Sequence, residues 1–311
     1  MEKPDKVCVV DSAYTLFLYL VIFNESINTT MFITADGIPR KILSLLPHHI
    51  EFPTFRGSKF PLLRRLIYCF YFLLFKKSKY KGLDKNGVYG QDHLFFSFVF
   101  MRKGFILLED GLGNYIHTAK RKASFIRKLL LRGDEWGYSR NVQSIYLTNL
   151  APVPEGIIKK VITVNIQEAW SNIDKKNKIK ILDVFNLDES IAFEQVDVMV
   201  MTQPFSEDNV ISEREKIEIY EQIISNYDGV VVIKPHPREK TNYKDHFSVP
   251  VLDGTIPVQL MLMFNRPGKI VTCFSSISTN DFNIPVDIYG TGICKKLETK
   301  YGIFESNINA F

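Results

Sequence analysis

The feature that most constrains this chain is a short apolar run that ends at a histidine between two prolines. Residues 230–233 are Val-Val-Val-Ile, a pattern that predicts a strand buried on both faces. The chain continues Lys-Pro-His-Pro-Arg through residue 238, and proline cannot extend a strand ladder. Ligands of open α/β sheets bind beyond the carboxyl ends of the strands. The run therefore predicts a parallel sheet that presents His236 at a ligand site, with a plain turn histidine as the alternative.

Strand-like and helix-like segments alternate along the rest of the chain. Strands are expected at residues 7–10, 31–34, 104–108, 144–147, 161–164, 196–201, 269–274 and 284–289. Helices are expected at residues 15–23, 60–75, 94–100, 179–185 and 259–264, and one more begins at the capping-box pair Ser212 and Glu215. This alternation is typical of βαβ units and predicts the α/β class with parallel sheets.

The length of 311 residues exceeds what one hydrophobic core usually serves. We therefore expect two Rossmann-like domains that face a central cleft, one at residues 1–190 and one at residues 191–311. The last stretch of about 20 residues is a candidate to pack back on the first domain.

Cysteine spacing and apolar runs exclude several classes of protein. The four cysteines are far apart and form no CxxC pair, which argues against a disulfide framework or a zinc site and favours a reducing compartment. Residues 1–6 lead directly into the first expected strand, so no signal peptide is predicted. The apolar runs at residues 16–23 and 66–75 are about half as long as a membrane-crossing helix. We recognise no nucleic-acid-binding module, so no nucleic-acid partner is expected.

Two basic segments stand out in a chain whose net charge is +5. Arg64 and Arg65 precede an apolar run that ends in Lys-Lys-Ser-Lys-Tyr-Lys at residues 76–81, and residues 120–132 form a second basic cluster. Such clusters hold proteins on anionic membranes or steer anionic substrates, and a solvated helix face is the alternative. The apolar helix around residues 68–75 is a candidate to contact lipid or a second subunit of a homodimer.

A second segment that carries chemistry is Glu109-Asp110-Gly111, directly after the strand expected at residues 104–108. Side chains alternate along an extended chain, so one carboxylate should face the ligand site and the other the scaffold. Glycine permits left-handed backbone and close approach of a ligand. We interpret this turn as the source of a general base, with a plain acidic turn as the alternative. His93 either lines the same cleft or packs locally at a helix start.

A third segment, Ser275-Ser276, begins a polar stretch after the strand expected at residues 269–274. The unpaired N–H groups at a helix start bind anions, so a phosphate site is predicted here, with serine N-capping as the alternative. The chain contains no Asp-x-Asp sequence, the usual carboxylate pair for a metal-bound nucleotide diphosphate. This pattern favours metal-independent transfer from a nucleotide-monophosphate sugar.

The three segments together resemble the shared motifs of bacterial sialyltransferases: acidic-acidic-glycine at 109–111, His-Pro at 236–237 and a serine pair at 275–276. Thr-Gln-Pro-Phe at 202–205 and Lys-Pro-His-Pro-Arg-Glu at 234–239 are similar to the lipooligosaccharide and capsule sialyltransferases, glycosyltransferase family 52. The resemblance implies a GT-B fold, with residues 1–190 as the acceptor-side domain and residues 191–311 as the CMP-sugar-binding domain. It also implies CMP-sialic acid as donor, a galactose-terminated glycan as acceptor, and inversion without metal or other cofactor. We expect such an enzyme in the bacterial cytoplasm, and the basic and apolar segments make peripheral contact with the inner face of the cytoplasmic membrane an option.

The resemblance assigns roles by matching position. Glu109 or Asp110 would be the general base, with Glu109 favoured and Asp208, on a loop of the second domain, as a rival. His236 would bind the donor phosphate and stabilise the departing CMP. The further donor-binding candidates are Lys234, Pro237, Gly111, Ser275 and Ser276.

Two other functions fit the same residues. A GT-B glycosyltransferase of surface-polysaccharide assembly would use another nucleotide sugar, because some members of the family are thought to transfer other sugars. A binding protein for nucleotide sugars or membrane surfaces would keep the cleft without chemistry. Thermal stabilisation by CMP rather than UDP or GDP tests the first alternative, and loss of donor over time tests the second.

Overall fold

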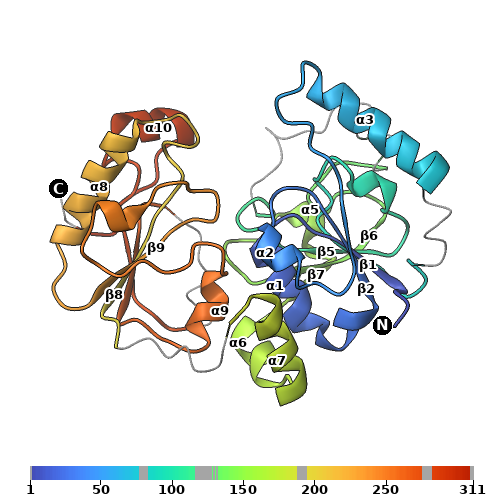
Figure 1. Ribbon diagram of the computed structural model, residues 1–311, viewed down its shortest axis with the longest axis horizontal. Coiled ribbons are helices and arrows are strands. Elements are labelled where there is room, and N and C mark those ends of the chain that lie inside the picture. The colour runs from blue at the N-terminus through green and yellow to red at the C-terminus, as the bar shows by residue number, and fades with distance from the viewer. Residues whose placement is uncertain are drawn as a thin grey trace. The chain divides into compact units, whose positions relative to one another are not determined.

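The computed structural model describes residues 2–76, 83–115, 128, 130, 132–187, 195–274 and 282–308. The chain divides into two compact units, Met1–Asp188 and Glu189–Phe311. Each unit is a sheet of strands accompanied by helices (Figure 1).

The sheet of the first unit contains seven strands within the described residues, and their pairings are parallel. The strands are β1 (Lys6–Val9), β2 (Thr30–Thr34), β3 (His49–Glu51), β4 (Val88–Gly90), β5 (Phe105–Leu108), β6 (Val142–Leu147) and β7 (Val161–Thr163). Their order across the sheet is β3-β2-β1-β4-β5-β6-β7. Because all strands run the same way, their carboxyl ends lie at one edge, where β1, β4, β5 and β6 are neighbours.

Helices pack on both faces of this sheet. They are α1 (Ala13–Ile22), α2 (Arg40–Leu43), α3 (Pro61–Tyr71), α5 (Glu155–Ile158), α6 (Ile166–Ser171) and α7 (Lys175–Val184). On one face α1 contacts α6 and α7, and the rings of Phe17 and Trp170 lie 6.3 Å apart. On the other face α3 inserts Cys69 into a core that contains Val7 and Val9. The aliphatic strand residues are thus buried on both sides, as in other parallel sheets.

The second unit contains four parallel strands in the order β11-β10-β8-β9 within the described residues. Its elements are β8 (Val198–Met201), α8 (Glu213–Ser225), β9 (Val231–Lys234), α9 (Val258–Leu262), β10 (Lys269–Thr272), β11 (Val286–Ile288) and α10 (Lys295–Tyr301). The predicted capping box begins α8: Ser212 Oγ accepts from the Glu215 N–H at 3.2 Å, and Glu215 Oε2 accepts from the Ser212 N–H at 2.8 Å. Tyr220 and Ile223 form the buried face of this helix.

The predicted α/β class, with parallel sheets in two Rossmann-like units, is confirmed. Each strand expected from sequence is found within a few residues of its predicted bounds. The helix expected at residues 94–100 is wrong, because only a 3₁₀ turn at Ser97–Val99 forms there. The buried Ser97 hydroxyl donates to the Gln91 carbonyl at 2.7 Å and bends the chain back toward the end of β4.

The C-terminal residues pack on their own unit. Leu297 of α10 is buried in a core with Tyr289, and the Phe304 N–H donates to Thr291 Oγ1 at 2.9 Å. Leu297, with Tyr301 and Ile308 packed beside it, therefore contributes to the core of the second unit, in a segment that the sequence offered as a candidate to pack on the first domain. In the described part of the chain, no helix has both the length and the apolar character needed to cross a membrane.

Candidate active site

Polar side chains follow four neighbouring strands of the first sheet at the point where each strand ends. They are Asp11 and Ser12 after β1, Asp92 and His93 after β4, Glu109 and Asp110 after β5, and Thr148 after β6. Hydrogen bonds join residues from different strands, so we treat this strand-end cluster as one site. Such an edge is where parallel α/β sheets bind ligands.

Glu109 is the buried member of the strand-end cluster, with 0% of its surface exposed. Its Oε1 accepts from the Tyr14 hydroxyl at 2.5 Å and from Thr148 Oγ1 at 2.6 Å. Its Oε2 accepts from the Thr148 N–H at 2.7 Å and from the Tyr115 hydroxyl. Burial raises the pKa of Glu109, although these donors favour the anion. Glu109 therefore ties α1 to the ends of β5 and β6.

Asp110 points to the opposite side, as alternation along an extended chain predicts, and 24% of its side chain is exposed. Its Oδ1 accepts from Ser12 Oγ at 2.9 Å and from Thr15 Oγ1 at 3.2 Å, and its Oδ2 lies 3.2 Å from His93 Nε2. Burial alone would raise the pKa of Asp110, but the contacts from His93, Ser12 and Thr15 outweigh burial and lower it. Asp110 is thus an ionised, partly exposed carboxylate at neutral pH.

The turn after Asp110 depends on a glycine. Gly111 has a φ of 68°, a left-handed conformation that glycine adopts without steric cost. The turn brings Asn114 back so that its Oδ1 accepts from the Asp110 N–H at 2.7 Å. Gly111 therefore shapes the backbone that presents the carboxylate.

His93 lies flat against an aromatic ring beside Asp110. The rings of His93 and Trp136 are stacked, with centroids 3.9 Å apart and planes at 10°. Trp136 has a φ of 62°, which is uncommon for a bulky residue. Buried Asp92 holds it there by accepting from the Trp136 N–H at 2.9 Å and the Gly137 N–H at 2.8 Å. Adjacent residues after β4 thus fix the tryptophan and contact the carboxylate.

Asp11 is a third carboxylate at this edge of the sheet. Its Oδ1 accepts from the Ala35 N–H at 2.8 Å and the Gly37 N–H at 3.0 Å, which joins the ends of β1 and β2. Burial raises the pKa of Asp11 to about 6, and the charges of Asp36 and Asp110 add to the rise against those two backbone donors. Asp11 and Asp110 therefore titrate in different pH ranges.

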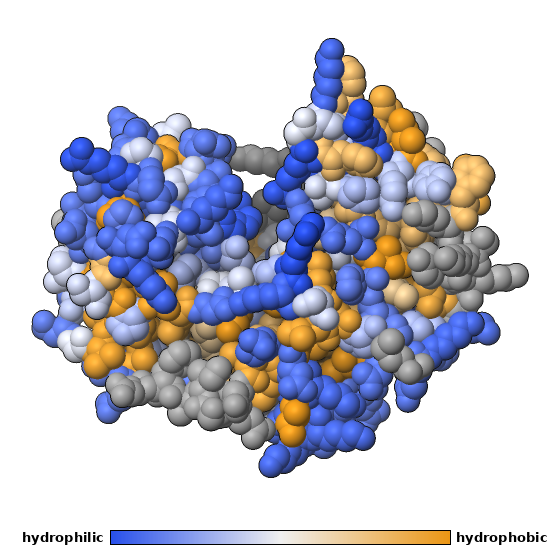
Figure 2. Space-filling model, viewed as in Figure 1, coloured by the Kyte–Doolittle hydropathy of each residue, from blue (hydrophilic) through white to orange (hydrophobic). Residues whose placement is uncertain are grey.

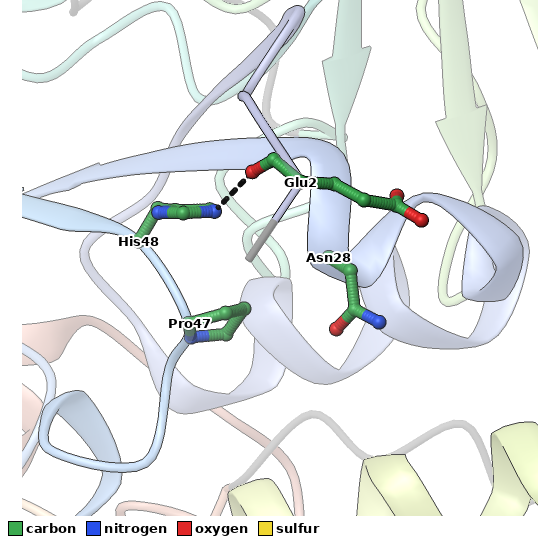
Figure 3. A pocket seen from close by; sticks show the side chains of 4 residues that line it. All are labelled: Glu2, Asn28, Pro47 and His48. Carbon is green, nitrogen blue, oxygen red and sulfur yellow. Dashed lines mark hydrogen bonds between the residues drawn. The ribbon is translucent and has the colours of Figure 1, made fainter.

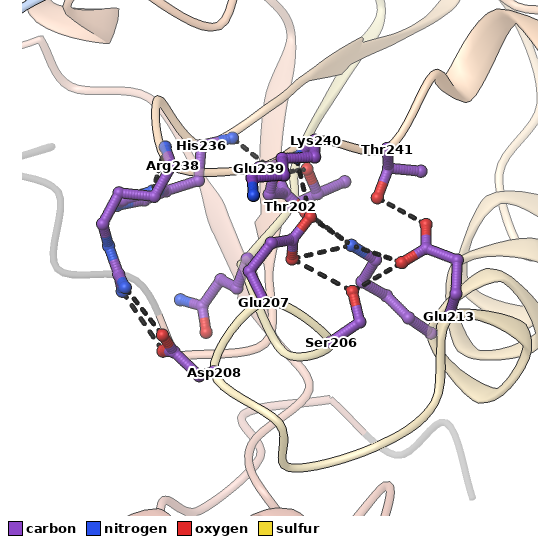
Figure 4. A network of polar contacts seen from close by, with 12 residues as sticks. Thr202, Ser206, Glu207, Asp208, Glu213, His236, Arg238, Glu239, Lys240 and Thr241 are labelled. Carbon is purple, nitrogen blue, oxygen red and sulfur yellow. Dashed lines mark hydrogen bonds and ion pairs between the residues drawn. The ribbon is translucent and has the colours of Figure 1, made fainter. Parts of the chain in front are cut away.

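In the second unit, the turn after β9 presents His236 (Figure 4). The His236 N–H donates to Glu239 Oε2 at 2.6 Å, and its Nδ1 accepts from the Arg238 N–H at 3.1 Å. An accepting Nδ1 places the ring proton on Nε2. Burial lowers the pKa of His236 to about 4, and the charges of Arg238 and Lys234 add to this effect. His236 is therefore neutral at physiological pH, with an N–H donor at Nε2.

A buried ionic network lies behind this turn (Figure 4). Glu239 Oε2 also accepts from Thr202 Oγ1 at 2.5 Å. Lys216, whose side chain is 0% exposed, places Nζ 3.0 Å from Glu207 Oε2, 3.3 Å from Glu213 Oε2 and 3.7 Å from Glu239 Oε1. A buried ammonium is stable only when such partners compensate its lost hydration. The network therefore fixes the backbone that carries His236.

Asp208, the rival base from sequence, is engaged in a bidentate ion pair. Arg238 Nη1 donates to its Oδ1 at 2.6 Å, Arg238 Nη2 to its Oδ2 at 3.2 Å, and the Tyr301 hydroxyl to Oδ2 at 3.2 Å. Burial would raise the pKa of Asp208, but the hydrogen bonds and charge of Arg238 lower it. The observed contacts make Asp208 an anchor for Arg238.

The remaining predicted donor-binding residues differ in their surroundings. Lys234 is buried, and its Nζ donates to the carbonyls of Pro235 at 2.9 Å and Gly254 at 3.0 Å. Burial lowers the pKa of Lys234 to about 8. Pro237 is exposed next to His236. The serine pair at 275–276 lies outside the residues that the structure describes.

A surface pocket of about 440 Å³ lies elsewhere in the first unit, lined by Glu2, Asn28, Pro47 and His48 (Figure 3). These residues lie near the amino ends of β1, β2 and β3, at the edge opposite the strand-end cluster. A hydrogen bond between His48 Nε2 and the Glu2 carbonyl, 3.0 Å long, crosses it. Across the residues that could be described, no three His, Cys, Asp or Glu side chains form a group able to hold a metal ion.

Several residues of the strand-end cluster have only a weak signal in the sequence. Val-Tyr-Gly at residues 88–90 is followed by Gln-Asp-His, the same order of apolar strand and polar turn that marks residues 104–110. That pattern indicates Asp92 and His93. Trp136 has no local signal, because it contacts His93 from a distant loop.

Comparison with known proteins places this chain in a family. The sequence pattern of glycosyltransferase family 52 matches residues 64–297. An uncharacterized protein of Haemophilus influenzae is 34% identical over 313 residues, which cover 96% of this chain and 98% of that protein. Among similar solved structures is the UDP-GlcNAc 2-epimerase from Methanocaldococcus jannaschii, with a TM-score of 0.46 and 13% identity over 90% of this chain and 82% of that chain. Another is the wall teichoic acid polymerase TagF, with a TM-score of 0.46 and 12% identity over 97% of this chain and 74% of that chain.

The family match confirms the resemblance to glycosyltransferase family 52 that was drawn from residues 202–205 and 234–239. It runs from α3 to α10 and includes Glu109, Asp110 and His236. Because it spans most of the chain, this protein belongs to glycosyltransferase family 52.

Proposed function

We propose that this glycosyltransferase moves sialic acid from CMP-sialic acid to a galactose-terminated glycan of lipooligosaccharide or capsule, with inversion and without a metal ion. Family membership and the match of the acidic, His-Pro and serine motifs support this choice of donor. The observation that carries the proposal is one partly exposed polar group at the strand ends of each unit. Asp110 is an ionised carboxylate, and His236 is a neutral N–H donor.

Asp110 is the proposed general base. A sugar hydroxyl is a poor nucleophile, so a carboxylate must accept its proton while the new C–O bond forms. Asp110 has exposed surface and is ionised at neutral pH, whereas the oxygens of Glu109 are buried and occupied by protein donors. We therefore assign the base to Asp110 and a positioning role to Glu109.

His236 is proposed to stabilise the negative charge that develops on the leaving group. As the bond between the sialic acid anomeric carbon and the phosphate oxygen breaks, the electron pair goes to CMP and negative charge grows on its phosphate. The Nε2–H of His236 can donate to that oxygen. Because His236 is neutral before the donor binds, the approaching anion would raise its pKa and strengthen the bond. Lys234 contributes positive charge from beneath the turn.

The test is an assay with CMP-sialic acid and a lactose-terminated acceptor in EDTA, scored for sialylated product and for free sialic acid. Product formed in EDTA, with the opposite anomeric configuration to the donor, is the expected result. Product that forms only when a divalent metal is restored would overturn the metal-free reaction. Absence of both product and hydrolysis, while CMP still raises the unfolding temperature, would assign the chain to a different sugar on the same nucleotide.

The identity of the nucleotide can be tested separately. A ligand that binds only the folded protein stabilises it by RT ln(1 + [L]/Kd), so its unfolding temperature rises with the ligand concentration. CMP should stabilise the chain, and UDP and GDP at the same concentration should not. Stabilisation by UDP or GDP alone would move the proposal to another nucleotide sugar.

A further inference from the structure

Helix α3 and the turn that continues it are apolar on two opposite sides. On the inner side, Cys69 and Phe72 are 0% and 1% exposed, and the Phe72 ring lies 4.9 Å from that of Phe52 in the core. The outer side is equally apolar and carries the side chains that we call the α3 surface: Leu62, Leu63, Ile67, Phe70, Leu74 and Phe75. The inner side already packs α3 against the core of the first unit, so packing of the helix does not account for the apolar side chains on its outer side.

The α3 surface is continuous and strongly exposed. Leu62 is 76%, Leu74 72% and Phe75 69% exposed, unusual values for large apolar side chains. Leu63, Ile67, Phe70 and Leu74 follow one another at intervals of three and four residues, the spacing of one helix face. Figure 2 shows orange side chains gathered over α3 beside blue hydrophilic ones. Contiguous apolar patches of this kind mark interaction sites.

The segment that contains this surface is uniformly basic. Residues 52–82 include eight Lys and Arg and no Asp or Glu, a charge of +8. Since the whole chain carries +5, the other residues together carry −3. Arg64 is exposed among the apolar residues, and Lys59 lies at the start of the helix, with its Nζ 5.8 Å from the Phe60 ring centroid. Any partner of the α3 surface must therefore be both apolar and anionic.

That combination decides between the two obvious partners. In a symmetric dimer the same patch would face itself, so two segments of charge +8 would be brought together in a contact that excludes water. An anionic bilayer instead provides hydrocarbon for the leucines and phenylalanines and phosphate headgroups for the cations. The 11 residues of α3 are too few to cross a bilayer and suit a helix lying in the interface.

We propose that the α3 surface docks the protein on an anionic phospholipid bilayer, with the apolar stripe in the headgroup boundary and the exposed cations Arg56, Lys59 and Arg64 on lipid phosphates. This docking goes beyond the proposed function and holds whichever nucleotide sugar is the donor. It would place the enzyme where a lipid-anchored acceptor presents its glycan.

The test is flotation of the full chain with vesicles of phosphatidylcholine containing about 30% phosphatidylglycerol, beside vesicles of phosphatidylcholine alone. We expect at least about tenfold stronger binding to the anionic vesicles, with most of it lost at ~0.5 M salt because screening weakens the headgroup contacts. Leu62→Gln with Leu74→Gln should weaken binding to anionic vesicles by about tenfold or more. Its unfolding temperature and its turnover of a soluble acceptor should match the wild type, because both side chains are exposed.

The matched control is Ile303→Gln in the second unit, which replaces an apolar side chain that is 81% exposed. It should bind vesicles like the wild type, because it lies outside the basic segment. Equal vesicle binding by the wild type and the Leu62/Leu74 variant would overturn the proposal. Failure of the wild type to float, together with a dimer in sedimentation velocity that the same variant dissociates, would assign the α3 surface to a second copy of the chain.

Discussion

The strand-end cluster of the first unit and the His-Pro turn of the second are built on a common plan. Each has a buried glutamate that gathers hydroxyl and backbone donors. Glu109 accepts from Tyr14, Tyr115 and Thr148. Glu239 accepts from Thr202, Tyr243 and the His236 N–H. In both places the buried carboxylate fixes the backbone and leaves a nearby residue to face outward.

The outward residues have opposite electrostatic surroundings. Asp110 is surrounded by donors from His93, Ser12 and Thr15, which lower its pKa and keep it an anion. The pKa of His236 is lowered to about 4 by burial and by neighbouring cations, so it stays neutral. One site is thus prepared to accept a proton and the other to donate a hydrogen bond. In both sites a buried glutamate fixes the backbone, whereas the neighbouring side chains determine the protonation state of the outward residue.

The largest expected effect comes from removing the carboxylate of the first site. Asp110→Asn keeps the shape but cannot accept a proton, so kcat should fall by about 10²–10⁴ with an unchanged unfolding temperature. The matched variant is Asp208→Asn in the second unit, which loses the Arg238 ion pair and should cost less than about tenfold. Steady-state kinetics with saturating donor measure both. A larger loss for Asp208→Asn would place the base in the second unit and break the comparison.

The next largest effect is expected from removing the hydrogen-bond donor His236 of the second unit. His236→Ala should lower kcat by about 10²–10³, the usual loss when one stabilising donor is removed. His236→Gln retains an amide N–H and should recover part of that loss. Single-turnover rates with CMP-sialic acid separate the bond-breaking step from product release. If alanine and glutamine variants are equally slow, hydrogen-bond donation is not the role of this residue.

The two buried glutamates should differ in their contribution to stability. Glu239→Gln removes a charge beside the buried Lys216 and should lower the free energy of unfolding by about 2–3 kcal/mol. Glu109→Gln disturbs neutral donors only and should cost about 1–2 kcal/mol. Urea unfolding followed by circular dichroism measures both, with the exposed Glu218→Gln as a control expected near zero. Equal losses in the free energy of unfolding would show that the buried Lys216 does not make Glu239 more important for stability than Glu109.

The smallest effect is a change in pH dependence. Asp110 must be deprotonated to act as a base, so kcat/KM should fall only as the pH drops through its lowered pKa, below that of an ordinary aspartate. His93→Gln removes a contact that lowers this pKa, so the acid limb should move to higher pH by roughly one unit. If kcat/KM of the wild type instead falls near pH 6, the general base would be Asp11, whose pKa is raised to about 6.

Much of the framework could be predicted from local patterns. Runs of branched residues at 230–233 and 270–272 identify buried strands, and the alternation after β5 predicts that Glu109 and Asp110 face opposite sides. These features are local because they depend on strand periodicity and turn chemistry. The location of His236 after β9 follows from the same reasoning.

The parts that escape prediction depend on contacts between distant segments. Strand β4 has only three residues and ends in Gly90, so its strand pattern is weak. Gly90 is needed because a Cβ there would lie 1.9 Å from the Val9 carbonyl oxygen, which shows how closely β4 approaches β1. Without β4, the contact of His93 with Asp110 cannot be inferred. The preference for Glu109 as base rests on position within a motif, and only the packing reveals that its oxygens are enclosed.

The stacking of Trp136 on His93 gives this protein an internal optical probe. The chain has two tryptophans, and the other, Trp170, packs against Phe17 on α1. An imidazole stacked on an indole quenches its fluorescence, so the emission of Trp136 depends on its contact with His93. Binding that changes the charge around Asp110 should therefore alter the emission of one tryptophan and leave the other constant. Occupancy of the first site can then be followed without a label.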